Sequence, residues 1–188
     1  MEWRSASRRG PLIGGPIPDS DTGLVTESPL PWAVVDLDGT LADVRHRLHH
    51  VERRPKDWSA FFAAAPKDAV LPEGEAVVRR LAQDHRVAYL SGRPERCRTD
   101  TQRWLDRFDL PPGPIYLRRA DDRRPSWRGK LSRLRRLSED GGVDVLVDDD
   151  PVVVQHAQAA GFTVLRADWM PREADDTLFD IQQSEGRT

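Results

Sequence analysis

The sequence predicts an α/β protein with a mainly parallel five-stranded sheet and helices on both faces of that sheet. Three observations support this prediction: short apolar runs recur along the chain, segments with helical spacing separate most of them, and one long interval interrupts the rhythm. Alternating strands and helices are typical of βαβ units, in which a helix crosses between two parallel strands. At 188 residues the chain is about one domain long and can bury a normal core.

Each expected strand is a short run of β-branched, aromatic or other apolar residues bounded by residues that break strands. The five runs are residues 32–35, 87–90, 115–117, 143–147 and 162–165. The expected helices cover residues 75–81, 101–108, 131–137 and 152–160. The last helix should start at Pro151 with Asp150 as its N-cap and end before Gly161.

One interval, from Ala42 to Leu71, contains no convincing strand. Its apolar residues predict one or two short helices, interrupted at Pro55 and ended at Pro66. We therefore expect a small helical cap, inserted directly after the first strand, at about residues 43–71.

The cap would belong to a domain spanning residues 31–172. Residues 1–30 are rich in proline, glycine, serine and charge, and residues 173–188 are similarly polar. Such segments cannot offset the conformational entropy that they would lose on folding, so we expect two flexible tails.

Composition excludes several classes of protein. The net charge is −2, from 29 basic and 31 acidic residues, which argues against a uniformly basic nucleic-acid binder. The single cysteine, Cys97, excludes a disulfide framework and a cysteine-based zinc site. No apolar run approaches the ~18 residues of a membrane-spanning helix and no secretory signal is visible, so we expect a soluble, cytoplasmic protein without membrane contact.

The charge is unevenly distributed along the chain. Residues 93–136 carry 14 Lys or Arg against 6 Asp or Glu, whereas residues 137–188 carry 3 against 12. Residues 93–136 thus form a basic belt, which would attract a polyanion with salt-dependent affinity. Trp104, Trp127 and Tyr116 lie within the belt, and these residues and Trp58 could offer stacking faces for bases.

Acidic, hydroxyl and basic residues adjoin the predicted strands. Asp36-Leu37-Asp38-Gly39-Thr40 follows the first run, Ser91-Gly92-Arg93 follows the second, Asp148-Asp149 follows the fourth, and Lys130 opens the helix before that strand. Ligands bind at the carboxyl ends of the strands in open parallel sheets, so these residues should converge on one edge.

This set of residues suits phosphoryl transfer. Carboxylates packed together repel each other unless a hard cation such as Mg²⁺ lies among them. The cation would screen Asp36, whose carboxylate could then attack phosphorus and form an aspartyl phosphate. Asp38 would protonate the leaving oxygen and later deprotonate water. Ser91 and the amides near Gly92 would hold phosphate oxygens, while Lys130 neutralises developing charge.

The segment Asp36-Leu37-Asp38-Gly39-Thr40-Leu41 resembles the first motif of the haloacid dehalogenase (HAD) superfamily. Ser91, Lys130 and Asp148-Asp149 match its second, third and fourth motifs in order. The resemblance implies a Rossmann-like HAD fold, with Asp36 as nucleophile and Asp38 as general acid/base. It also implies a Mg²⁺ cofactor at Asp36, Asp38, Asp148 and Asp149, with Asp38 contributing its backbone.

A narrower resemblance involves residues 116–125, which lead into Lys130. They are similar to the polynucleotide kinase phosphatase branch, whose phosphatase module removes 3′-phosphates from nucleic acid ends. The chain departs from that branch at residues 126–129, where acidic residues are usual. The expected substrate-binding residues are Thr40, Arg47, Gly92, Arg93, Arg118 and Arg124. No GxxxxGK[ST] loop is present, so no kinase half is expected. Whether a separate kinase or ligase partner acts alongside stays open at this point.

Two other functions stay open at this point. One is a HAD phosphatase of a small metabolite, such as a nucleotide or sugar phosphate, and the other is a non-catalytic nucleic-acid- or protein-binding module. Arg124 or Arg128 could replace Lys130 in its role. The sequence leaves open DNA against RNA, single against double strand, and the oligomeric state.

Overall fold

The computed structural model describes residues 29–52 and 54–170, so nearly all of both expected tails lies outside the described residues. Five parallel strands form one sheet in the order β5-β4-β1-β6-β7, which confirms the predicted fold class. The strands are β1 (Trp32–Val35), β4 (Arg86–Pro94), β5 (Ile115–Arg118), β6 (Val143–Asp148) and β7 (Val164–Arg166).

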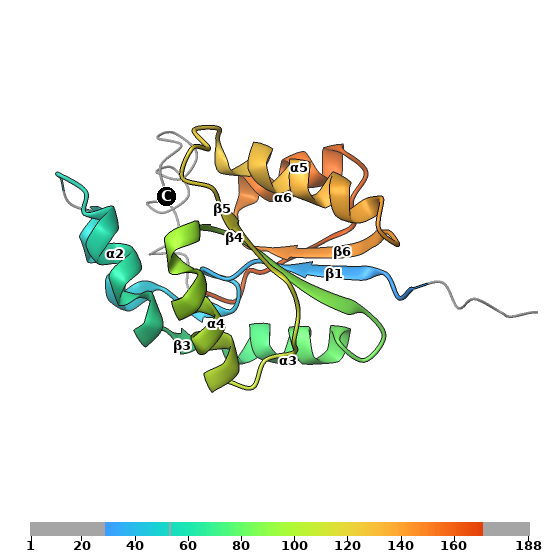
Figure 1. The fold of residues 1–188 in the computed structure, drawn as a ribbon, viewed down its shortest axis with the longest axis horizontal. Helices are drawn as coiled ribbons and strands as arrows, with labels where there is room; N and C mark the ends of the chain where they lie inside the picture. The colour runs from blue at the N-terminus through green and yellow to red at the C-terminus, as the bar shows by residue number, and fades with distance from the viewer. Residues whose placement is uncertain (1–28, 53, 171–188) are drawn as a thin grey trace, which may run out of the picture.

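Helices cover both faces of this sheet, as Figure 1 shows: α3 (Pro72–Leu81) and α4 (Arg98–Arg107) lie on one face, and α5 (Ser126–Ser138) and α6 (Pro151–Ala159) lie on the other. Successive strand residues point to opposite faces. In β1, Val35 therefore packs with the core under α3 and α4, whereas Val34 packs with the core under α5 and α6. The sheet is thus buried on both sides.

The insertion after β1 lies beyond the carboxyl ends of the strands (Figure 1). It contains four short helices: η1 (Arg45–Arg47), α1 (His49–Glu52), α2 (Trp58–Ala64) and η2 (Ala65–Lys67). Their apolar residues, among them Phe61 and Phe62, form a separate small core that also includes Cys97. Cys97 is therefore a packed residue, and burial raises the pKa of its thiol.

The expectation of no strand in this interval was wrong. β2 (Ala42–Asp43) and β3 (Ala69–Val70) pair antiparallel, with Ala42 opposite Val70. Two residues are too few to produce an alternating pattern, so sequence periodicity does not detect this pair. It closes the base of the insertion where the chain leaves and returns.

The strand after α3 also differs from its prediction. β4 runs on to Pro94, which pairs with Arg118 of β5 after a register shift that begins at Leu90. Ser91, Gly92 and Arg93 therefore lie within the strand and not after it. The remaining boundaries move by a few residues: η3 (Glu95–Cys97) precedes α4, and β7 starts at Val164. None of the described helices is long and apolar enough to cross a bilayer.

The start and end of α6 confirm the predicted capping. Asp150 accepts hydrogen bonds from the backbone amides of Val152 and Val153, and Pro151 is the first helical residue. Gly161 has a φ of 89°, the left-handed conformation that favours glycine after a helix. Asp150 thus has the structural role of a helix cap, as its position before Pro151 predicts.

One helix presses directly on the loop that follows β1. Gly74 in α3 is so close to this loop that a Cβ added there would lie 2.1 Å from the carbonyl oxygen of Thr40. Gly129 in α5 offers a contrast, because its added Cβ would meet its nearest atom at 3.5 Å.

We predict that Gly74→Ala destabilises the protein by about 2 kcal/mol, because overpacking against backbone outweighs the ~1 kcal/mol gained in helix propensity. Gly129→Ala, the matched control, should stabilise by about 0.5–1 kcal/mol. Chemical denaturation of both variants measures the two effects. Equal changes in the free energy of unfolding would contradict the packing argument.

Candidate active site

Three carboxylates meet at the carboxyl edge of the sheet. Val35 of β1 lies opposite Val147 of β6, and the Asp36 amide donates to the Val147 carbonyl at 2.9 Å. Asp36 and Asp148 therefore leave adjacent strands side by side. Together with Asp149 they form the carboxylate cluster: one oxygen from each residue lies within 4.8 Å of the others, and all three residues are buried.

Lys130 faces the carboxylate cluster from α5. Its Nζ donates to Asp148 Oδ2 at 2.7 Å and lies 3.1 Å from Asp36 Oδ1. Burial disfavours the ammonium ion, but Asp148 and Asp36 outweigh burial and raise the pKa of Lys130, which stays charged. The structure thus places Lys130 beside Asp36, the predicted nucleophile.

The charges in this cluster do not balance, because three carboxylates face one ammonium group. Burial, with Asp36 and Asp150 nearby, raises the pKa of Asp148 to about 8, and burial raises the pKa values of Asp36 and Asp149 as well. Among the described residues, Asp36 Oδ1 and Asp149 Oδ2 are buried without a directed hydrogen bond. Clustered oxygen ligands with excess negative charge fit a hard divalent cation such as Mg²⁺.

Thr40 forms a hydrogen bond with one member of the carboxylate cluster, Asp149. It was expected to bind substrate, but its hydroxyl is buried and donates to Asp149 Oδ1 at 3.0 Å. Its carbonyl oxygen accepts from Trp169 Nε1 at 2.9 Å. In this structure Thr40 therefore orients a candidate metal ligand.

A second cluster lies beside the first and contains Asp38, Asp68, Arg47 and Arg93, which we call the arginine–aspartate cluster. Arg47 Nη2 bonds to Asp38 Oδ1 at 2.7 Å and to Asp68 Oδ2 at 2.8 Å. Arg93 makes the same two connections, with Nε at 2.8 Å from Asp38 Oδ1 and Nη2 at 3.0 Å from Asp68 Oδ2. Two guanidinium groups match two carboxylates, so this cluster is balanced in charge.

The arginines set the charge state of Asp38. Burial alone would raise the pKa of this carboxyl group, but Arg47 and Arg93 lower it to about 2. Both arginines were expected to bind substrate, and both are fully buried against the predicted acid/base residue. Arg47 also stacks on Phe61 at 4.1 Å, and its Nη1 is a buried donor with no hydrogen-bond partner among the described residues.

Asp68, which was not predicted from the sequence, joins the insertion to the candidate active site. Besides both arginines it contacts His46 Nε2 at 2.8 Å, and its carbonyl oxygen accepts from Trp104 Nε1 at 2.9 Å. No motif marks an isolated acidic residue after Pro66. Its position becomes informative only when β3 brings the end of the insertion back beneath α4.

The predicted phosphate-binding residues border a cavity of about 220 Å³. Ser91, Gly92 and Lys130 line one end, and Arg118 and Arg124 line it farther out. Arg124 is tied to Asp122 at 2.7 and 2.9 Å, and Arg118 donates to the Asp122 carbonyl at 3.2 Å and to the Arg124 carbonyl. These two arginines therefore also hold the loop between β5 and α5 in shape.

We predict that Asp149→Asn stabilises the protein in EDTA by about 1–2 kcal/mol, because it removes one of three mutually repelling carboxylates while Asn can still accept from Thr40. The same change should remove most of the stabilisation by Mg²⁺, which for the wild type is about 2.7 kcal/mol at 100 times the dissociation constant. Thermal unfolding with Mg²⁺ and with EDTA measures both effects.

The pH dependence of the wild type adds a check on that prediction. Folding raises the pKa of Asp148 from 3.8 to about 8, so the folded protein holds the extra proton in this window. In EDTA the free energy of unfolding should therefore fall as pH rises from 4 towards 8. Asp150→Asn, which keeps the helix cap, is the control and should retain the response to Mg²⁺. A loss of stability in Asp149→Asn would contradict the repulsion argument.

For Asp68→Asn we predict a loss of about 3 kcal/mol, because two buried guanidinium groups would share one carboxylate. The matched control is Asp43→Asn, which breaks the surface pair with Arg45 at 2.6 Å. That variant should lose no more than about 1 kcal/mol. Urea denaturation distinguishes the two, and similar losses would show that burial of the arginine–aspartate cluster does not matter.

Comparisons with known proteins identify the family of this chain. Residues 31–169 match the family model of the polynucleotide kinase PNKP phosphatase domain. A chain in a structure of the Pnkp1/Rnl/Hen1 RNA repair complex is 24% identical with a TM-score of 0.60, and the match covers 73% of this chain and 42% of that chain. In a second Pnkp1/Rnl/Hen1 structure the identity is 25%, the TM-score 0.57, and the coverage 73% and 46%. This chain thus spans less than half the length of those relatives.

A haloacid dehalogenase-like hydrolase from Streptococcus pneumoniae is 10% identical with a TM-score of 0.47, over 73% of this chain and 84% of that chain. No curated protein matches this chain at a significant level. The family match covers the sheet, the insertion and both charged clusters. The chain therefore belongs to the polynucleotide kinase PNKP phosphatase domain family, a group of HAD-type phosphatases.

Proposed function

We propose that this phosphatase removes 3′-phosphates from nucleic acid ends with Mg²⁺, through an aspartyl-phosphate intermediate. The observation that carries the proposal is the juxtaposition of two charged clusters. Asp36 lies in the unbalanced carboxylate cluster and Asp38, two residues later, lies in the balanced arginine–aspartate cluster. One loop thus presents a candidate nucleophile and a candidate proton donor with opposite electrostatic surroundings.

The carboxylates of Asp36, Asp148 and Asp149 would hold Mg²⁺, with which the backbone of Asp38 could also associate. When bound, the cation would offset the negative charge that otherwise keeps a phosphate dianion away from Asp36. The carboxylate of Asp36 then attacks phosphorus, and the bond from phosphorus to the 3′-oxygen breaks. Lys130 stays charged and stabilises the phosphoryl oxygens, together with Ser91 and the amide of Gly92.

Asp38 moves the protons in both steps. It gives a proton to the departing 3′-oxygen, and it later accepts a proton from the water that hydrolyses the aspartyl phosphate. With a pKa of about 2 in the free protein, Asp38 is deprotonated there, which is the charge state that a proton acceptor needs. A bound phosphate would compete for Arg47 and Arg93, weaken their hold on Asp38 and raise its pKa towards the value an acid needs.

The substrate class rests on the family and on the charges around the cavity. The family model describes the phosphatase domain of a polynucleotide kinase. A similar chain occurs in an RNA repair complex with Rnl and Hen1. We therefore propose a nucleic acid end as substrate, with a separate end-processing partner such as a kinase or ligase.

We predict that the wild type releases phosphate from a 3′-phosphorylated oligonucleotide in Mg²⁺ and not in EDTA. Its 5′-phosphorylated isomer, a 3′-mononucleotide and an aryl phosphate should turn over more slowly. Asp36→Asn should lower the rate by about 10³-fold or more, because it removes the nucleophile. Phosphate release measured on all four substrates tests this.

Each alternative function has its own outcome in that assay. Release mainly from the small esters, still dependent on Asp36, would indicate a metabolite phosphatase. A gel shift with oligonucleotide that survives Asp36→Asn, with no turnover by the wild type, would indicate a binding module.

A further inference from the structure

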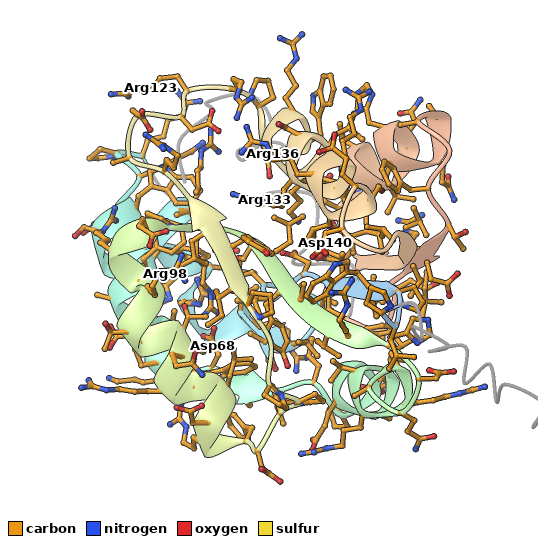
Figure 2. The ribbon with its side chains drawn as sticks, turned by 45° about the vertical axis from the view of Figure 1, so that its right-hand side comes forward. Asp68, Arg98, Arg123, Arg133, Arg136 and Asp140 are labelled. Carbon is orange, nitrogen blue, oxygen red and sulfur yellow. The ribbon has the colours of Figure 1, made fainter. Side chains whose placement is uncertain are left out.

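The cavity beside Ser91, Gly92 and Lys130 extends along α5, and we call it the basic groove. Its lining includes Gly92 and the buried residues Ser91 and Lys130, together with residues of the β5–α5 loop and of α5. Figure 2 shows Arg133 and Arg136 reaching from α5 toward the loop that carries Arg123. Because Lys130 lines the groove and its Nζ lies 3.1 Å from Asp36 Oδ1, the groove reaches the residue that would attack the scissile phosphate.

The charge of this groove is one-sided. Among the described residues that line it, six are basic and one, Asp122, is acidic. The basic residues are Arg118, Arg119, Arg124, Lys130, Arg133 and Arg136. A concave surface lined by one sign of charge concentrates ligands of the opposite sign.

Most of these cations already have partners in the protein. Arg119 pairs with Asp121 at 3.0 Å and Arg124 with Asp122 at 2.7 Å, while Lys130 contacts Asp148. Within the described chain, neither Arg133 nor Arg136 forms an ion pair. These two guanidinium groups are left to bind an anion that comes from outside.

Arg133 and Arg136 also continue along α5 from Lys130, which lies in the candidate active site. Lys130, Arg133 and Arg136 follow one another at three-residue spacing, which forms a ridge on a helix surface. Each step advances about 4.5 Å along the helix axis. The guanidinium group of Arg133 lies over the Tyr116 ring at 4.2 Å, and this contact holds it at the wall of the groove. Arg135, on the same helix, does not line the groove.

We propose that Arg133 and Arg136 bind the phosphodiester backbone next to the terminal 3′-phosphate. The kcat/KM of the enzyme would then depend on the length of the strand. This inference rests on the proposed function, in that the terminal phosphate occupies the site beside Lys130. A mononucleotide reaches only Ser91, Gly92 and Lys130. A strand of two or more nucleotides places its next phosphates against the two arginines.

The first experiment measures kcat/KM for 3′-phosphorylated oligonucleotides of one, two, three and six nucleotides, in ribose and deoxyribose form. For the wild type we expect kcat/KM to rise by about tenfold or more from one to three nucleotides and then to level off. Arg133→Gln/Arg136→Gln should lower the ratio of hexamer to mononucleotide by about tenfold. Arg135→Gln, the matched control on α5, should keep the wild-type ratio.

The second experiment does not depend on turnover. It measures binding of a fluorescent hexanucleotide with a 3′-hydroxyl end, by anisotropy, over a range of salt concentrations. The double variant should bind more weakly, and the slope of log affinity against log salt should become shallower by about 1–1.5, since each lost phosphate contact accounts for ~0.7. Arg136→Gln alone, at an exposed position, serves if the double variant does not fold.

Three results would overturn the inference: an unchanged hexamer-to-mononucleotide ratio in the double variant, an equal loss in Arg135→Gln, or no binding of the hexamer by the wild type. The failure of the proposed function looks different. In that case no 3′-phosphorylated strand is hydrolysed, while the hexamer still binds and the double variant still loses this binding.

Discussion

The register between β1 and β6 is the constraint on which the rest of the site depends. The bond from the Asp36 amide to the Val147 carbonyl, and the pairing of Val35 with Val147, leave Asp36 and Asp148 at adjacent strand ends. Neither residue can move away without breaking the ladder between two central strands that are buried on both faces. The closeness of these carboxylates is therefore a property of the fold, and either protonation or a bound cation would relieve their repulsion.

The carboxylate cluster keeps its excess negative charge, whereas the neighbouring arginine–aspartate cluster is balanced. Thr40 and Lys130 hold the carboxylate cluster in place without neutralising it. The insertion does the opposite for Asp38, because it supplies Arg47 and Asp68 and thereby completes a balanced set with Arg93. Leu37, the residue between Asp36 and Asp38, is completely buried, which anchors the loop between two environments that favour different protonation states.

The parts of this structure that follow local rules could be predicted from the sequence. Apolar runs predicted all five strands of the sheet, and Asp150, Pro151 and Gly161 predicted both ends of α6. The motif carboxylates could be placed because parallel strands share one carboxyl edge. The β2–β3 pair, the extension of β4 past Leu90 and the role of Asp68 could not be predicted. Each of them depends on which distant segment of the chain packs against it, and the periodicity of apolar residues does not indicate that.

The charge of the basic belt, residues 93–136, likewise could not be interpreted from the sequence alone. Counting along residues 93–136 suggested a strongly cationic surface, yet the fold pairs many of those arginines. Arg98 bonds to Glu95, Arg119 to Asp121 and Arg124 to Asp122, whereas Arg93 is consumed inside the active site. What distinguishes a polyanion site from a solvated helix face is therefore which cations stay unpaired and where they point. Arg133 and Arg136 meet both conditions, because they form no ion pair with another described residue and lie on the ridge of α5 that begins at Lys130. These two residues therefore indicate a polyanion site, which the total charge of the belt does not.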